Sequence, residues 1–166
     1  KEFNWNKWTR KTHYWGSFVI ILPISIVITT GILLQLKKEI NWIQPPTSNG
    51  GHNNAPTISF DNILASVKTA DEANITSWDD VDRLDVRIDK GIVKVRGKNR
   101  WEVQVDTETG DVLQVAYRRS DLIESLHDGS WFHDKVKIWL FLPSGIILFV
   151  LWITGLYMFI LPYTVK

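Results

Sequence analysis

The chain has 166 residues, a formal net charge of +1 and no cysteine. A charge this close to zero gives no electrostatic argument for nucleic-acid binding, and the lack of cysteine excludes disulfides, thiolate catalysis and zinc sites with cysteine ligands. Residues 12–36 and 138–165 contain no Asp, Glu, Lys or Arg. These two stretches exclude a purely soluble globule and a disordered chain, and they are too few for a multispan channel built by one copy.

The two apolar stretches predict transmembrane helices over residues 14–36 and 136–161. A helix needs about 20 apolar residues to cross the hydrocarbon core of a bilayer, which is ~30 Å thick. Basic residues beside a span favour the cytoplasmic side, and Trp favours the headgroup layer. Residues 1–13 are rich in both. We therefore expect segment 1–13 in the cytoplasm, and a tail of residues 162–166 that returns there.

The polar region between the spans predicts a linker over residues 37–56 and a soluble domain over residues 57–128. Pro45-Pro46 prevents a helix from continuing, and Gly50-Gly51 supplies a flexible turn. Ser59 is a good N-cap for a helix. A second short helix is predicted near Asp121, with its end at Gly129.

Four short segments between residues 84 and 117 alternate apolar and polar side chains and are separated by turns, which predicts a four-stranded antiparallel sheet. One sheet face should pack on the helix that follows Ser59. The predicted core is Phe60, Ile63, Leu64, Val67, Leu84, Val86, Ile88, Trp101, Val103, Val105 and Val115. The alternation puts the other strand side chains in solvent, among them Asp85, Asp89, Glu102, Gln104 and Asp106. No His or Ser partner is implied beside these carboxylates, so we expect no active site in this domain.

Three histidines lie near the predicted membrane surfaces. His13 lies where the first span enters from the cytoplasm, whereas His127 and His133 precede the second span on the outer side. The spacing of His127-Asp128 and His133-Asp134 permits a metal site with His127 and His133 as ligands. The alternative for these two residues is a helix stop followed by an N-cap. The alternative for His13 is an interfacial side chain that reaches the headgroups.

The two spans carry related small and polar residues. Pro23 lies ten residues after His13, as Pro143 does after His133, and each span contains Thr-Gly. Because the spans run in opposite directions, this pattern indicates a weak inverted repeat. Small side chains let membrane helices approach closely, so we expect contacts with partner helices at these residues: Thr30, Gly31, Ser144, Gly145, Thr154 and Gly155.

Three segments carry a resemblance to a known family. Residues 101–113 resemble the end of a PepSY domain. Residues 10–16 and 126–130, each followed by a span with Thr-Gly, resemble the helices of PepSY-associated transmembrane proteins. The resemblance implies the fold class: membrane α plus small α+β, with two transmembrane helices flanking one PepSY-like helix-on-antiparallel-sheet domain.

The resemblance also bears on function. Larger members are similar to ferric-siderophore reductases and hold haem b through histidines at helix ends, which match His13 and His127 here. These two residues should lie about a bilayer thickness apart, ~30 Å, so any haem would need a ligand from another chain. PepSY domains are also associated with propeptides that restrain peptidases.

The sequence therefore predicts a non-catalytic accessory or assembly subunit of a bacterial inner-membrane complex, with the PepSY-like domain in the periplasm and no cofactor. The expected partners are other membrane subunits or further copies of the chain, together with the lipid bilayer, and no nucleic acid. The alternatives are a haem b electron-transfer subunit with ligands shared with another chain, and a peptidase-restraining module.

Overall fold

The computed structural model describes residues 5–51 and 56–164. The chain divides into two compact units. The central domain is Gln35–Leu122, and the helical hairpin joins the residues up to Leu34 with those from Ile123 onward. Each unit has its own architecture.

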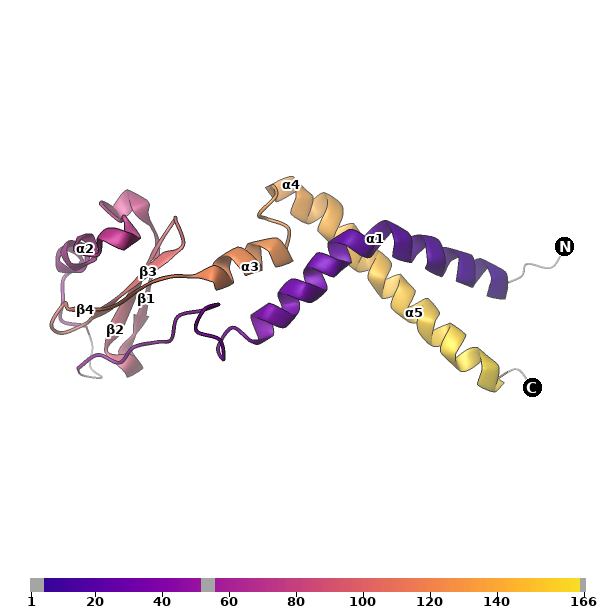
Figure 1. Cartoon of the computed structure of the whole chain (residues 1–166), viewed down its shortest axis with the longest axis horizontal. Helices are drawn as coiled ribbons and strands as arrows, with labels where there is room; N and C mark the ends of the chain where they lie inside the picture. The colour runs from indigo at the N-terminus through magenta and orange to yellow at the C-terminus, as the bar shows by residue number, and fades with distance from the viewer. Residues whose placement is uncertain (1–4, 52–55, 165–166) are drawn as a thin grey trace. The chain divides into compact units, whose positions relative to one another are not determined.

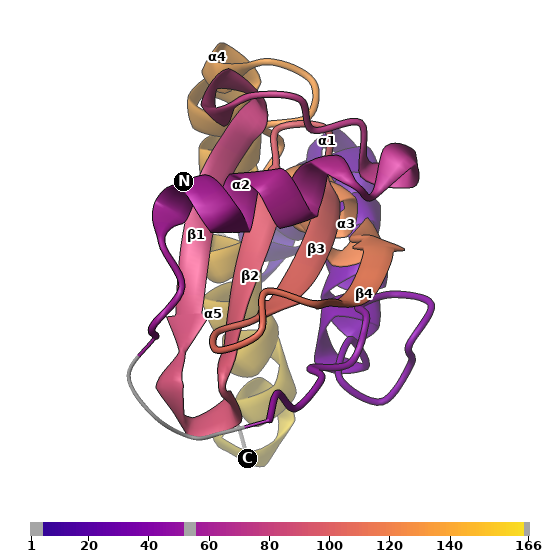
Figure 2. The same cartoon turned by 90° about the vertical axis from the view of Figure 1, so that its left-hand side faces the viewer.

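The central domain is a four-stranded antiparallel sheet with one helix across it. Its elements are α2 (Phe60–Lys68), β1 (Val81–Arg87), β2 (Ile92–Gly97), β3 (Trp101–Asp106) and β4 (Val112–Tyr117), with short 3-10 turns at Asp71–Ala73, Trp78–Asp80 and Ile88–Lys90. The strand order is β1-β2-β3-β4. Figure 2 shows α2 lying across one face of the sheet. The predicted helix-on-sheet layout is confirmed.

The core lies between α2 and the two central strands. Ile63 and Val67 of α2 pack against Val93 and Val95 of β2 and against the valines of β3. The Ser59 side chain accepts a hydrogen bond from the backbone N–H of Asn62 at 3.2 Å, as the predicted N-cap requires. The helix therefore begins where its apolar stripe can cover the sheet.

The predicted core is wrong at three positions. Phe60, Val86 and Ile88 are 65%, 45% and 55% exposed. Phe60 is the first residue of α2 and stacks edge-on against Trp78 instead of entering the core. Val86 lies on an edge strand, and a 3-10 turn begins at Ile88 and ends the strand alternation.

The polar sheet face is buried over the two central strands, which contradicts its predicted exposure there, whereas Asp89 is exposed as predicted. Lys94, Glu102, Gln104 and Asp106 are at most 4% exposed. Residues 43–51, here called the strap, bind this side of the sheet: Gly50 N–H donates to the Lys90 carbonyl at 2.8 Å. Part of the predicted linker is thus hydrogen-bonded into the domain.

The hairpin contains both helices that are long and apolar enough to cross a membrane, Trp5–Gln35 and Asp134–Tyr163. The first is α1. The second runs through α4 (Asp134–Val136), a π-helical segment (Lys137–Phe141) and α5 (Leu142–Thr164), and α3 (Arg119–His127) precedes it. Figure 1 shows that α1 is bent. Pro23 inside α1 accounts for a bend, because proline removes a helix hydrogen bond and its ring clashes with the preceding turn.

The two long helices cross each other (Figure 1), and Gly16 of α1 lies against α5. A Cβ at Gly16 would lie only 2.9 Å from Leu151 Cδ2. Ile20 and Leu151 beside the crossing are 3% and 6% exposed, although most of each helix is uncovered. A larger side chain at Gly16 would therefore push the two helices apart or displace Leu151, whereas the sequence singled out Gly16 only as the end of the motif 10–16.

Candidate functional site

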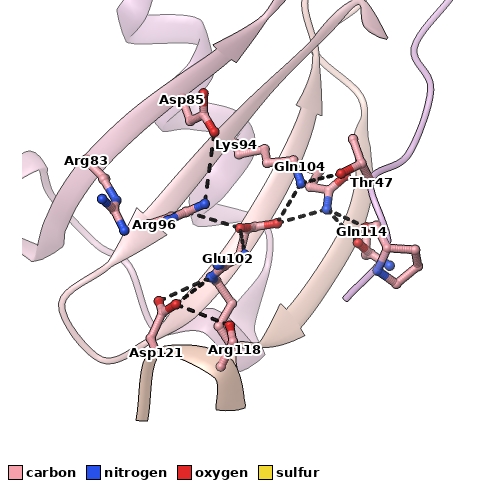
Figure 3. A network of polar contacts seen from close by, with 12 residues as sticks. Thr47, Arg83, Asp85, Lys94, Arg96, Glu102, Gln104, Gln114, Arg118 and Asp121 are labelled. Atoms are coloured by element: carbon pink, nitrogen blue, oxygen red, sulfur yellow. Dashed lines mark hydrogen bonds and ion pairs between the residues drawn. The ribbon is translucent and has the colours of Figure 1, made fainter. Parts of the chain in front are cut away.

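Glu102 on β3 is the centre of a buried charge cluster (Figure 3). Arg118 Nη1 donates to its Oε2 at 2.7 Å, and Gln104 Nε2 donates to its Oε1 at 2.9 Å. Lys94 Nζ lies 3.5 Å from Oε1. Arg96 Nε lies 3.3 Å from Oε2, without hydrogen-bond geometry. The single carboxylate of Glu102 thus lies close to three cations.

Two further carboxylates complete the cluster at its edge. Arg118 Nε donates to both carboxylate oxygens of Asp121 at 3.1 Å, and Arg96 Nη2 lies 4.0 Å from Asp85. The cross-strand register explains the arrangement, since Arg96 faces Glu102 directly across the β2–β3 ladder.

The strap closes one side of the cluster, at the right of Figure 3. Lys94 Nζ donates to Thr47 Oγ1 at 2.7 Å, and Gln104 Nε2 donates to the Pro46 carbonyl at 2.9 Å. The Ser48 N–H donates in return to Gln104 Oε1 at 2.8 Å. The side-chain amide of Gln104 therefore recognises the strap backbone through both of its polar atoms.

Burial and pairing act against each other in this cluster. Burial lowers the pKa of Lys94, and the negative charge of Glu102 opposes that shift. Burial also acts to lower the pKa of Arg118, but its hydrogen bonds to Asp121 and the charge of Glu102 outweigh burial and raise it. Both oxygens of Glu102 already accept hydrogen bonds, so the geometry suits holding strands and strap together better than taking a proton from a substrate.

The second polar site lies in the hairpin and consists of two contacts, each between a histidine and a threonine. His13 Nδ1 on α1 lies 3.2 Å from Thr154 Oγ1 on α5. His127 Nδ1 lies 3.0 Å from Thr30 Oγ1 on α1. His13 of α1 thus contacts α5, and His127 at the end of α3 contacts α1. The structure thus joins four of the residues that the sequence singled out into two pairs, and Gly31 and Gly155 lie beside His127 and His13.

The helix-packing residues divide into two groups. A Cβ at Gly31 would meet His127 Cε1 at 3.4 Å, and one at Gly155 would meet His13 Cε1 at 3.7 Å. Both glycines thus face the chain's own histidines. A Cβ at Gly145 would meet nothing within 4 Å, and Ser144 Oγ donates to its own helix at the Leu140 carbonyl.

His133 and the neighbouring Asp128 of the predicted metal site make hydrogen bonds within the chain. His133 Nδ1 accepts the Lys135 backbone N–H at 3.0 Å, as a helix N-cap does. Asp128 accepts from Lys137 Nζ at 2.6 Å; burial acts to raise the pKa of Asp128, but the hydrogen bonds from Lys137 and Ser130 lower it to about 2. Within residues 5–51 and 56–164, no group of three or more His, Asp or Glu side chains converges on a metal position.

One groove beside a histidine is large enough for a ligand. It encloses about 550 Å³. Its lining is mostly apolar and includes His13, Arg10, Tyr14 and Met158. His127 contacts the helix at Thr30, which is 17 residues after His13 on α1 (30 − 13 = 17), a rise of about 25 Å at ~1.5 Å per residue. One copy therefore does not bring both histidines to one iron atom.

Sequence reasoning missed the charge cluster and the strap. The signal for the cluster was present in β2, where Lys94 and Arg96 alternate with Val93 and Val95 on a strand that is central in the sheet. A central strand with long cations on its second face needs carboxylates on the next strand, as Glu102 provides. The strap carries no such signal, because its contacts are mostly through backbone atoms.

We expect Glu102→Ala to cost about 3–5 kcal/mol of stability, because it leaves buried cations without their counter-charge. Amide exchange of the full chain, followed by mass spectrometry, should show faster exchange in β2 and β3. Asp89→Ala is the matched control, since this exposed carboxylate should change stability by at most ~0.5 kcal/mol. Equal effects of the two substitutions would show that the cluster contributes little.

Comparison with protein-family models matches residues 10–161 to the PepSY-associated TM region. Neither the search of curated proteins nor the search of solved structures gave a match. The matched range includes nearly all of both long helices and the whole sheet between them. The chain is therefore a membrane protein of the PepSY-associated transmembrane family.

Proposed function

We propose that the protein is a non-catalytic accessory subunit of a bacterial inner-membrane complex, with its PepSY-like domain in the periplasm. The observation that carries this proposal is the uncovered surface of the spans. Only 17% and 11% of the residues in their most apolar stretches are buried within the chain. Membrane helices gain stability from close packing and not from escaping water, so partner helices have a large surface to use.

The open face at Gly145 supports docking in the membrane. A Cβ at Gly145 would have no neighbour within 4 Å among the described residues, whereas one at Gly31 or Gly155 would meet a histidine. Small residues at such a face allow a second backbone to approach closely. The central domain supports a non-catalytic role, since its charge cluster is used in holding strands and strap together.

Gly145→Leu should remove the protein from its complex while the hairpin stays intact, because the added side chain fills the outer face and does not touch the crossing at Gly16. Native electrophoresis of mildly solubilised membranes would measure the change in complex size. Gly145→Ala is the matched control and should keep the complex. A leucine variant that still migrates with the complex would contradict docking at this face.

The proposed topology places the N-terminal end of α1 and the C-terminal end of α5 in the cytoplasm. Because the chain has no cysteine, a single introduced thiol reports its side of the membrane. Asp89→Cys on an exposed turn of the domain should react with an impermeant maleimide in intact spheroplasts. Lys11→Cys should react only after the inner membrane is opened. The reverse pattern of labelling would invert the topology.

A second candidate function is electron transfer through haem b. It is favoured by the groove of about 550 Å³ beside His13, which also presents the Arg10 cation. His13 would hold the iron, Arg10 would pair with a haem carboxylate, and a further ligand would come from another chain. Bound haem would supply one-electron chemistry, and the residues of this chain would hold and orient it.

This candidate predicts a Soret band in the purified full chain. His13→Ala should abolish the band, because it removes the axial ligand. His133→Ala should keep it, since His133 caps α4. A wild-type protein without a Soret band, purified from cells supplied with haem, would leave the accessory role as the function.

A further inference from the structure

The two histidine–threonine pairs of the hairpin share one arrangement. In each pair, an imidazole from one helix segment lies on a Thr-Gly step of the other. His13 lies against Thr154-Gly155, and His127 lies against Thr30-Gly31. Both contacts use Nδ1 and both place Cε1 beside the glycine. The same contact thus occurs twice, in opposite directions along the hairpin.

The threonine hydroxyls decide which ring nitrogen carries a proton. Thr30 Oγ1 lies 2.6 Å from the Ile26 carbonyl oxygen, and Thr154 Oγ1 lies 3.0 Å from the Leu151 carbonyl oxygen. These are donor–acceptor distances for an O–H···O hydrogen bond. A hydroxyl has one proton to donate. Because each hydroxyl donates that proton to its own helix, its oxygen accepts from the histidine.

The imidazole must therefore donate through Nδ1–H. If the Thr30 hydroxyl donated to His127 instead, two oxygens with lone pairs would face each other at 2.6 Å with no proton between them. Such a contact between two acceptors is repulsive. In a neutral imidazole that donates through Nδ1, the lone pair lies on Nε2. Among the described residues, no hydrogen-bond partner is found for Nε2 of His13 or His127.

We propose that Thr30 and Thr154 are positioning residues that hold His127 and His13 as Nδ1–H tautomers, so that each ring presents the Nε2 lone pair to a ligand. Two sites of one imidazole each result, one toward each end of the hairpin. Their ligand is an electron-pair acceptor, namely a metal centre with an open coordination position. Binding at Nε2 leaves the Nδ1–H···O contact in place, so the hairpin keeps its helix contacts when a ligand binds.

Metal-ligating histidines are commonly fixed in this way by a hydrogen bond at the other ring nitrogen. A threonine hydroxyl that already donates to its helix can only accept, which makes it a strict selector of the tautomer. The nature of the ligand rests on the second candidate function, whereas the tautomer does not.

Nitrogen NMR of the full chain in lipid nanodiscs tests the assignment. The sample carries ¹⁵N-histidine, contains no haem and is kept at alkaline pH, where imidazole is neutral. His13→Gln and His127→Gln assign the ring signals. We expect a protonated Nδ1 and an unprotonated Nε2 in both rings. A proton on Nε2 of either ring would overturn the proposal.

The threonine variants test the cause. Thr154→Val keeps the side-chain shape without the hydroxyl, and it should make His13 a mixture of tautomers while His127 stays unchanged. Thr30→Val should do the reverse, and Thr154→Ser should restore the wild-type signals of His13. A His13 tautomer that is unchanged in Thr154→Val overturns the positioning role. If the valine variants do not form the hairpin, the wild-type and serine spectra decide.

Haemin added to the wild-type sample separates the two proposals. Coordination should remove the Nε2 signal of a histidine that binds iron and keep its Nδ1–H. Haemin that leaves both Nε2 signals unchanged would overturn the metal-centre ligand and the second candidate function. The tautomer is measured before haemin is added, so that outcome leaves its result intact.

Discussion

The need to pair every buried charge organises the central domain. Glu102 is 1% exposed and lies among three cations. Removing it would leave Lys94, Arg96 and Arg118 partly desolvated and mutually repulsive. The same carboxylate links β2 and β3 to Arg118, where the chain leaves the sheet for α3. A polar sheet face thereby becomes a second, ionic core that specifies where the strap lies.

The hairpin is held together by weaker interactions than the central domain. In a bilayer, two helices gain no hydrophobic energy from pairing, and hydrogen bonds between them average about 0.6 kcal/mol. The close approach at Gly16 and the two histidine–threonine contacts are the specific interactions between α1 and the returning segment. They fix the antiparallel register at both ends. They leave most of both helix surfaces uncovered, which is the physical reason to expect further helices around them.

The sequence predicts where helices and strands lie better than it predicts which of their side chains are buried. Alternation locates all four strands, because Val93, Val95, Val103 and Val105 lie on one side of the sheet. Alternation also assigns Glu102 and Gln104 to solvent, and this is wrong because the strap covers them. Long-range backbone contacts, such as Gly50 N–H to Lys90, leave no trace in a periodic pattern. Phe60 shows the converse error, since its helical spacing suits the core but its place at the first turn of α2 does not.

The candidate site follows a different rule. A histidine before each span and a Thr-Gly pair within each span were visible in the sequence, and the opposite directions of the spans indicated an inverted relation. Their pairing depends on a three-dimensional fact that spacing does not contain, namely the register at which the helices pack, with Gly16 against Leu151. In this register His13 of α1 meets Thr154 in the middle of α5, and His127 meets Thr30. The domain satisfies its buried charges internally, whereas each hairpin histidine keeps one nitrogen unused. The two units thus differ in which polar atoms they leave for further contacts.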